Sequence, residues 1–202
     1  DGTHTLEEIQ VAFQQRFKQP VALADLEQLV TDLDRRLFLD TPQFRAAWKL
    51  AVEQYLNGHS RPAAHAGGAY AAEPAALRGP PGEAADVPTG LCGVLSPHID
   101  LHRGGPAFAY AYKRLIEQSD ADVFVIFGTA HNPLSNLFSV SKKHFETPLG
   151  TVEIDRQFIS KLAANLAATP GGQTLNLFAD ELAHRQEHSI EFQVVFLQYL
   201  LA

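Results

Sequence analysis

The 202-residue chain has little or none of several residue types, and each shortage excludes a class of protein. Its single cysteine, Cys92, cannot form an internal disulfide, which is typical of proteins from a reducing cytoplasm. Lys and Arg number 16 against 23 Asp and Glu, and the net charge of −7 argues against nucleic acid as an obligate partner. No apolar run approaches the roughly 18 residues of a membrane span, and no basic-then-apolar leader is present. We therefore expect a cytoplasmic protein without a membrane segment.

Methionine is absent altogether, so we expect the chain to begin inside a longer gene product. Residues 200–202 continue a helical apolar pattern, and we expect the chain to be a fragment that stops within a helix. Its hydrophobic content of 46% is enough for one medium domain or two small ones. We also predict an exposed apolar face where a missing part would pack, with some self-association of the fragment.

Residues 1–57 have the periodicity of helices. Thr5 and Glu8 match a capping box, in which each side chain accepts a hydrogen bond from the other residue's backbone. Three apolar stripes follow at helical spacing: Leu6, Ile9, Phe13 and Phe17; Leu26, Leu29, Val30, Leu33 and Leu37; and Phe44, Trp48, Val52 and Tyr55. The run 37–39 could pair as a short strand, so we predict a small helical, winged-helix-like module. The first 60 residues carry six basic and nine acidic side chains, which disfavours DNA binding and favours packing or protein interaction.

Residues 58–90 are rich in Ala, Gly and Pro, with breaks at Gly67-Gly68 and Gly79-Pro80-Pro81-Gly82. This composition predicts a linker that could drape over the following domain. The segments 61–64 and 69–70 are the candidates for anchoring it.

In residues 91–202, apolar strands alternate with helical patterns. Four runs predict strands, at 91–96, 122–128, 137–141 and 174–178. Three runs predict helices, at 106–118, 155–167 and 187–201, the second of them capped by Asp155. We therefore predict an α/β fold with a largely parallel sheet. Ligands of such sheets bind beyond the carboxyl ends of the strands.

Two histidines lie at that edge of the predicted sheet. His98 follows the first strand and a rigid Pro97, and His131 follows the second strand. Neutral imidazoles in these places could bind a divalent metal, with Asp100 as an orienting carboxylate and His102 in the same loop. Taken alone, His98 could equally be a loop residue bonded to the backbone, and a lone strand-end histidine such as His131 is more often structural. Two histidines at one edge, however, favour a functional site.

A third histidine motif spans residues 183–195. His184 and His188 are four residues apart, as are Glu187 and Glu191, and such pairs share one face of a helix. A histidine beside carboxylates can be a metal ligand, a general base or a proton shuttle. The pattern His-x-x-Glu-His also matches the inverted zinc proteases, in which both histidines bind zinc and the glutamate is the general base.

The other chemically capable residues have no supporting pattern. Cys92 lies within an apolar run and is predicted to be a small core residue. The segment 147–150, Thr-Pro-Leu-Gly, is predicted to be a turn that could line the cleft. The remaining histidines have no partner in the sequence and are predicted to be structural: His4, His59, His65 and His144.

Together these motifs resemble the Memo family, whose bacterial members are called AmmeMemoRadiSam system protein B. The resemblance covers roughly residues 61–202 and is carried by four segments in order: Pro97-His98, Phe127 to His131, Thr147 to Gly150, and Glu187 to Glu191. One departure is Pro-His-Ile-Asp after the first strand, where the family often has Pro-His-Ala-Gly. Residues 1–57 resemble PqqD-like winged-helix domains, which bind peptides for radical SAM enzymes.

The resemblance implies a fold similar to the class III extradiol ring-cleaving dioxygenases, with a non-haem metal site at the end of an α/β sheet. It implies iron or copper bound by His98 and His131, and imidazole suits either metal. His188 would be an acid/base near the metal, with Glu187 and Glu191 orienting it. The third ligand implied by the family is a cysteine beyond residue 202.

The first functional hypothesis is therefore a Memo-like, metal-dependent redox or oxygen-handling protein, a dioxygenase-like oxidoreductase if it is an enzyme. Its partner would be a radical SAM protein or a peptide substrate, met through the N-terminal module. The first alternative is a non-enzymatic scaffold that grips a peptide or protein with the cleft histidines. The second is the inverted zinc metalloprotease.

Overall fold

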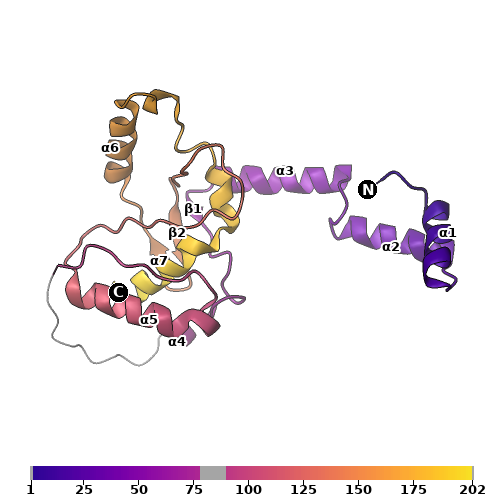
Figure 1. The fold of residues 1–202 in the computed structure, drawn as a ribbon, viewed down its shortest axis with the longest axis horizontal. Helices are drawn as coiled ribbons and strands as arrows, with labels where there is room; N and C mark the ends of the chain where they lie inside the picture. Colours follow the sequence, from indigo (N-terminus) through magenta and orange to yellow (C-terminus); the bar gives the residue numbers. More distant parts are fainter. Residues whose placement is uncertain (1, 78–89, 202) are drawn as a thin grey trace. The chain divides into compact units, whose positions relative to one another are not determined.

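The computed structural model describes residues 2–77 and 90–201 (Figure 1). The chain divides into two compact units, Asp1–Gln54 and Tyr55–Ala202. The sequence placed this boundary after residue 57, at the end of a helix. The last turn of that helix belongs to the second unit, because Tyr55 is buried there.

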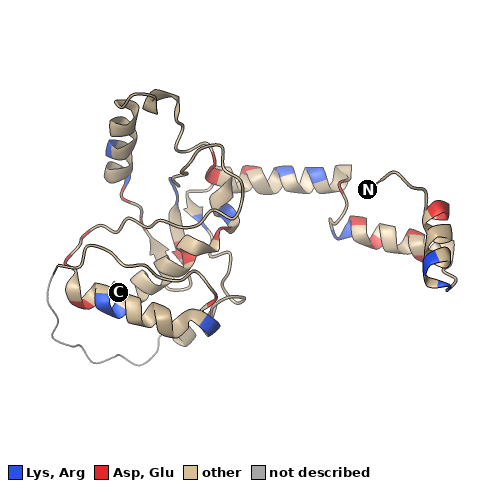
Figure 2. Ribbon diagram, in the orientation of Figure 1, with Lys and Arg blue, Asp and Glu red and all other residues tan. Residues whose placement is uncertain are grey.

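The first unit contains the helices α1 (Leu6–Phe17) and α2 (Leu23–Arg35) and most of α3 (Pro42–Asn57). The predicted capping box is present: the Thr5 hydroxyl accepts from Glu8 N, and Thr5 N donates to the Glu8 carboxylate at 2.8 Å. Acidic and basic side chains both occur along the three helices (Figure 2). α1 packs against α2, yet neither helix has a buried residue.

The predicted short strand at residues 37–39 is wrong. Leu37 adopts a left-handed conformation with a φ of 64°, and Phe38 N donates to Leu33 O at 2.9 Å. The backbone therefore bonds back to the end of α2 instead of to a neighbouring strand. Within residues 2–57 the structure contains helices and no strand, so a wing is not formed there.

The second unit has a three-stranded sheet in the order β1 (Ser60–Arg61), β2 (His144–Thr147) and β3 (Gly150–Val152). β1 is parallel to β2, with Arg61 opposite Phe145, and β2 is antiparallel to β3. The predicted turn at 147–150 closes this hairpin, and Gly150 takes a φ of 124° that a side chain would strain. The mixed helix-and-sheet class is confirmed.

The predicted parallel sheet, however, is wrong. Within the described residues none of the four predicted strands is a hydrogen-bonded strand. Segments 91–96 and 122–128 have no ladder partner, and some of their apolar side chains are exposed, Leu95 by 98% and Phe127 by 79%. Others are partly buried against the core: Leu91, Phe124 and Ile126. Only one backbone hydrogen bond joins the other two segments, from Val140 N to Leu177 O at 2.8 Å. An apolar run favours an extended chain, but a strand also needs a neighbour to pair with.

The predicted linker is also only partly a linker. Residues 60–61 form β1, and the side chains of Arg61 and Tyr70, both among the predicted anchors, are almost fully buried. The short helix α4 (Pro74–Leu77) follows. Residues 58–77 therefore belong to the second unit, whereas 78–89 lie outside the described residues.

The core of the second unit lies between α5 (Leu101–Gln118) and α7 (His188–Leu201), which pack against each other (Figure 1). Phe108 is fully buried and stacks on Phe196 with ring centroids 4.8 Å apart. α5 begins five residues before the predicted start at Pro106, because Asp100 caps it by accepting from Arg103 N. Among the described residues, no helix combines the length and the apolar character needed to cross a membrane.

The remaining elements complete the second unit. α6 (Arg156–Ala167) begins at the predicted cap, where the Asp155 carboxylate accepts from Phe158 N at 2.9 Å. Two 3₁₀ helices follow, η1 (Gly172–Thr174) and η2 (Glu181–Gln186), and the single residue Glu187 separates η2 from α7. α7 starts one residue after the predicted start at Glu187.

Candidate metal centre

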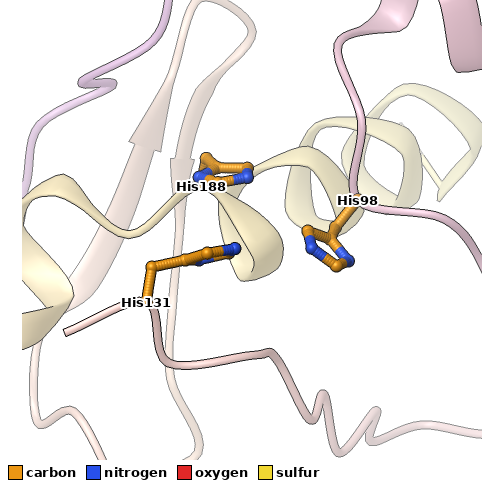
Figure 3. A group of neighbouring side chains, drawn as sticks. All are labelled: His98, His131 and His188. Atoms are coloured by element: carbon orange, nitrogen blue, oxygen red, sulfur yellow. The ribbon is translucent and has the colours of Figure 1, made fainter. Parts of the chain in front are cut away.

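Three histidines from separate parts of the chain meet at one place (Figure 3). His98 and His131 follow the two extended apolar segments, and His188 is the first residue of α7. One nitrogen of each ring lies within 4.8 Å of the others. The centroids of the His131 and His188 rings are 4.5 Å apart, and His98 lies 5.3 and 5.6 Å from them. Three imidazoles at this spacing can share one transition-metal ion.

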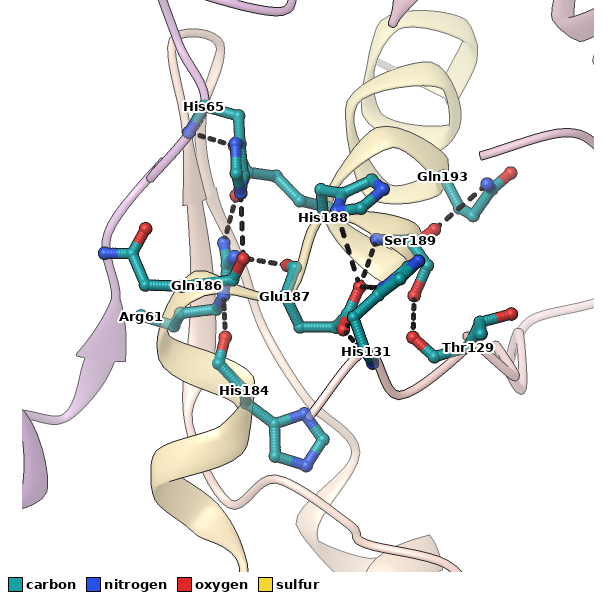
Figure 4. A network of polar contacts seen from close by, with 11 residues as sticks. Arg61, His65, Thr129, His131, His184, Gln186, Glu187, His188, Ser189 and Gln193 are labelled. Carbon is teal, nitrogen blue, oxygen red and sulfur yellow. Dashed lines mark hydrogen bonds and ion pairs between the residues drawn. The ribbon is translucent and has the colours of Figure 1, made fainter. Parts of the chain in front are cut away.

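The carboxylate of Glu187 holds the His131 ring in place (Figure 4). Its oxygens lie 3.0 Å from His131 Nδ1, and they also accept from His131 N and Ser189 N, both at 3.0 Å. A carboxylate only accepts, so Nδ1 of His131 carries the proton and Nε2 keeps its lone pair for a ligand. Metal-binding histidines commonly have such an arrangement.

The charge of Glu187 is maintained by these contacts. The side chain is 8% exposed, and burial by itself would raise the pKa of Glu187. The hydrogen bonds from the backbone N–H groups of Ser189 and His131, and from their side chains, outweigh burial and lower its pKa to about 2. The carboxylate is therefore ionised at neutral pH.

The pKa of His188 is lowered from its ordinary value. Burial is the largest cause, and the neighbouring rings of His131, His65 and His98 add to it, although Glu187 opposes the shift. Its Nδ1 lies 3.7 Å from Glu187 Oε1. A lowered pKa keeps the imidazole neutral at neutral pH, which is the form that accepts a proton or binds a metal.

Two polar residues of α7 attach the histidine loops to the helix. The Ser189 hydroxyl donates to Thr129 O at 3.0 Å, and the Gln193 amide donates to Pro97 O at 3.0 Å. Gln193 in turn accepts from the Tyr112 hydroxyl of α5 at 2.7 Å. Each loop is therefore fixed within two residues of its histidine.

Close approach of one loop to α7 also requires a glycine. A Cβ at Gly128 would come within 2.6 Å of Ile190 Cγ1 and closer still to Ser189 Oγ. No sequence motif predicted a role for Ser189, Gln193 or Gly128. The available signal was two uncharged polar residues, four apart, in a largely apolar helix.

His184 lies apart from the cluster, although the sequence pattern placed it beside His188. It is buried in η2, its Nε2 is 3.0 Å from Ser139 Oγ, and burial lowers its pKa. Glu187 between the two helices is extended, with φ −76° and ψ 125°, so no single helix carries both histidines. The arrangement of an inverted zinc protease is therefore not formed.

Glu191 also differs from its predicted place. Its carboxylate is fully buried and contacts the Arg61 guanidinium, the Tyr70 hydroxyl and His65 N instead of the His188 ring. The residue was predicted, with Glu187, to orient His188. One turn of α7 separates the two residues, and Glu191 lies on the side of the helix that faces the buried Arg61.

Asp100 and His102 were predicted to lie at the edge of the metal site. Asp100 is the N-cap of α5, and its carboxylate contacts the Arg103 guanidinium at 2.5 Å, which lowers the pKa of Asp100. His102 is exposed in the first turn of α5. The carboxylate that reaches a cluster histidine is Glu187.

A fourth histidine, His65, lies beside the cluster although the sequence showed no partner for it. Its ring is edge-on to that of His188, with centroids 5.6 Å apart. Its Nε2 lies 3.0 Å from Gln186 O, and its backbone N donates to Glu191 at 2.9 Å. The signal that could have found it was its place between the two anchor segments.

Comparison with known proteins places the chain in a family. The model of the Memo family, described as Memo-like protein, matches residues 61–202. A MEMO1 family protein of Aquifex aeolicus is 29% identical over 99% of this chain and 52% of its own length. MEMO1 family proteins of Methanococcoides burtonii and Methanosarcina mazei are 38% and 36% identical over 54% of this chain, and over 37% and 36% of their own lengths.

The chain spans about half, or less, of the length of these curated relatives. No solved structure matches it significantly. The family match covers more than two thirds of the residues, including all four cluster and neighbouring histidines. The chain therefore belongs to the Memo family.

Proposed function

We propose that this Memo-like chain is a metal-dependent redox or oxygen-handling protein of the AmmeMemoRadiSam B type, with iron or copper held by His98 and His131. The observation that supports this most strongly is the convergence of three imidazoles, from three separate segments, within 4.8 Å. The donor set fits these metals, since imidazole suits both iron and copper. When bound, such a metal supplies one-electron and oxygen chemistry.

The surrounding residues fit a metal centre as well. Glu187 holds the proton of His131 on Nδ1, so that Nε2 is free to bind. Ser189 and Gln193 fix the two histidine loops on α7, which keeps the ligand nitrogens together before a metal arrives.

His188 is proposed to carry protons at this site. Its lowered pKa keeps Nε2 or Nδ1 able to accept a proton near neutral pH. Its position at the first residue of α7, next to Glu187, holds the ring beside His131. In this role His188 moves a proton to or from a substrate, and the metal stays on the other two histidines.

The partner is proposed to be a radical SAM protein or its peptide, in the cytoplasm, with the first unit as a PqqD-like docking module. Support comes from the large apolar side chains that its helices expose, among them Leu29, Trp48 and Leu50. Both signs of charge occur along these helices (Figure 2). An exposed apolar surface with a polar rim is typical of a protein-binding face.

The test is metal analysis of the purified chain after anaerobic reconstitution with Fe²⁺ or with Cu²⁺. We expect one metal per chain, with His98→Ala and His131→Ala each losing most of it. His188→Ala should keep the metal, because His188 is proposed to carry protons. His102→Ala is the matched control, since it removes an exposed histidine near the site and should change nothing.

A parent chain without bound metal, or equal metal in the parent and the His98 and His131 variants, contradicts the proposal. Loss of metal in His188→Ala makes His188 a third ligand instead of a proton carrier.

A non-enzymatic binding scaffold is the second candidate. It is favoured by the exposed apolar side chains of Leu95 and Phe127, which lie on the segments that lead to His98 and His131. A scaffold would hold its peptide or protein partner equally well with and without a chelator. Partner binding that a chelator abolishes contradicts this candidate.

A further inference from the structure

A fully buried charge of the second unit, the guanidinium of Arg61, lies beside the residues that build the histidine cluster. Arg61 has no exposed surface, and its guanidinium is surrounded by acceptors from three parts of the chain (Figure 4). Nε donates to His184 O at 2.7 Å, and one terminal nitrogen donates to Glu187 O at 2.6 Å. The other terminal nitrogen lies 2.5 Å from Glu191 Oε2 and donates to Pro62 O at 3.1 Å.

These acceptors mark the point where the chain changes from η2 to α7. His184 O lies in η2, Glu187 O belongs to the extended residue between the helices, and Glu191 lies in the first turn of α7. At the same point the Glu187 side chain turns to His131, and His188 enters the cluster. One guanidinium therefore bonds both sides of the bend from which the site is built.

We propose that the buried Arg61–Glu191 pair is a positioning unit of the histidine centre, which sets the bend before α7 so that Glu187 reaches His131. The pair acts through Glu187 and His188 and touches no cluster ring itself. This positioning role rests on the proposed metal-binding function, because the pair holds in place the backbone that carries Glu187 and His188.

The geometry requires arginine rather than any cation. The guanidinium is planar and donates in several fixed directions, and here it serves three carbonyls and one carboxylate. A lysine ammonium in the same place would keep the charge. It has at most three donors on a flexible stem, so it cannot reach His184 O and Glu187 O in the same fixed plane.

Glu191, the second residue of the pair, also positions His65. Glu191 accepts from the Tyr70 hydroxyl at 2.5 Å and from His65 N at 2.9 Å. Tyr70 is 2% exposed, and burial together with the negative carboxylate raises its pKa well above the ordinary value, so it stays a donor. Segment 61–70 is thus tied to α7 through one carboxylate, and His65 is carried on it beside His188.

The decisive variant is Arg61→Lys, measured by two independent readouts. The first is the tautomer of His131, read from long-range ¹H–¹⁵N spectra of the metal-free chain at pH 8. We expect the parent to hold the proton on Nδ1 and Arg61→Lys to give a mixture of tautomers. The second is the dissociation constant for Fe²⁺ under anaerobic conditions, which we expect to rise about 10- to 100-fold.

The matched control is Arg156→Lys, the same chemical change on an exposed side chain of the same unit. It should leave the His131 tautomer and the Fe²⁺ dissociation constant as in the parent. Circular dichroism of each variant checks that the helices remain.

The outcomes separate this inference from the proposed function. A changed tautomer in Arg61→Lys, with no Fe²⁺ bound even by the parent, supports the positioning role and contradicts the metal function. An unchanged tautomer in a folded Arg61→Lys overturns the positioning role, whatever the metal does.

If Arg61→Lys does not fold, Tyr70→Phe decides the question. It removes one hydroxyl donor from Glu191 and keeps the buried ring. We expect a smaller change of the same His131 signals, with Fe²⁺ binding weakened about two- to tenfold. His131 signals identical to those of the parent would overturn the proposal.

Discussion

Two helices of this protein show how differently its two units are stabilised. α1 in the first unit has a full capping box, and none of its residues is buried. α7 in the second unit has seven buried residues, including the polar side chains of Glu191 and Gln193. Local signals define the first helix, whereas tertiary contacts with α5, β1 and two loops define the second.

This difference indicates which substitutions should lower the stability of the protein most. Most polar residues in α1 are exposed and contribute little beyond their local bonds, although the half-buried Gln10 donates to Val21 O at 2.7 Å. Polar residues in α7 are buried with specific partners, and removing one partner leaves the other without compensation. The histidine cluster lies against the second kind of helix, where buried partners fix the position of each side chain.

The largest expected difference between the units concerns one aromatic ring in each. Phe108 is fully buried and stacked on Phe196, so Phe108→Ala should lower the free energy of unfolding by about 3–5 kcal/mol. The ring centroids of Phe13 and Phe17 lie 4.8 Å apart in a helix without buried residues. Phe13→Ala should therefore lower the free energy of unfolding by only about 1 kcal/mol.

Urea unfolding can measure both changes separately. Trp48, the single tryptophan, reports on the first unit by fluorescence, and near-ultraviolet circular dichroism of the stacked rings reports on the second. Equal losses for the two phenylalanine variants would remove the contrast between the units.

Between pH 8 and 5, a pH effect on stability is expected from two histidines of the second unit, His184 and His188. Burial lowers the pKa of His184, so the unfolded chain takes up a proton at higher pH than the folded protein does. Stability is therefore fully present above about pH 6.5 and falls as the pH drops below it, by at most about 1.4 kcal/mol per pH unit for one proton. His188, whose pKa is also lowered, contributes with the same sign.

Unfolding curves between pH 8 and 5 test this expectation. His184→Gln should reduce the slope of stability against pH, since it removes the titrating group and keeps a polar side chain opposite Ser139. An unaltered slope in His184→Gln would show that His184 is protonated equally in both states.

The smallest expected effect is the loss of a helix cap. Thr5→Ala removes the hydroxyl that accepts from Glu8 N and should weaken α1 by about 1 kcal/mol. Because α1 has no buried residue, the loss should appear as faster amide exchange within α1, and the unfolding of the second unit should stay as in the parent. Protection of α1 equal to that of the parent would mean that packing rather than capping holds this helix.

The sequence predicted helices and turns well where the signals are local. The box at Thr5, the cap at Asp155 and the turn at 147–150 are all present. Each depends on a side chain and backbone groups a few residues apart, so the pattern contains the whole interaction.

Prediction failed where a partner had to come from elsewhere in the chain. The apolar runs at 91–96 and 122–128 predicted strands, but a strand exists only with a paired neighbour. The composition of residues 58–77 predicted a linker, although Arg61 and Tyr70 are buried by partners about 120 residues away in sequence. His65 was missed for the same reason.

By itself the sequence determined which residues can do chemistry and where the chain forms helices, because residue type and short-range spacing decide both. It singled out His98, His131, Glu187 and His188 as candidates. Only the tertiary structure decided that three of the histidines meet, that His184 does not join them, and that Glu191 pairs with Arg61. The physical reason is that burial and distance between remote residues depend on how the helices and loops pack, which no local pattern encodes.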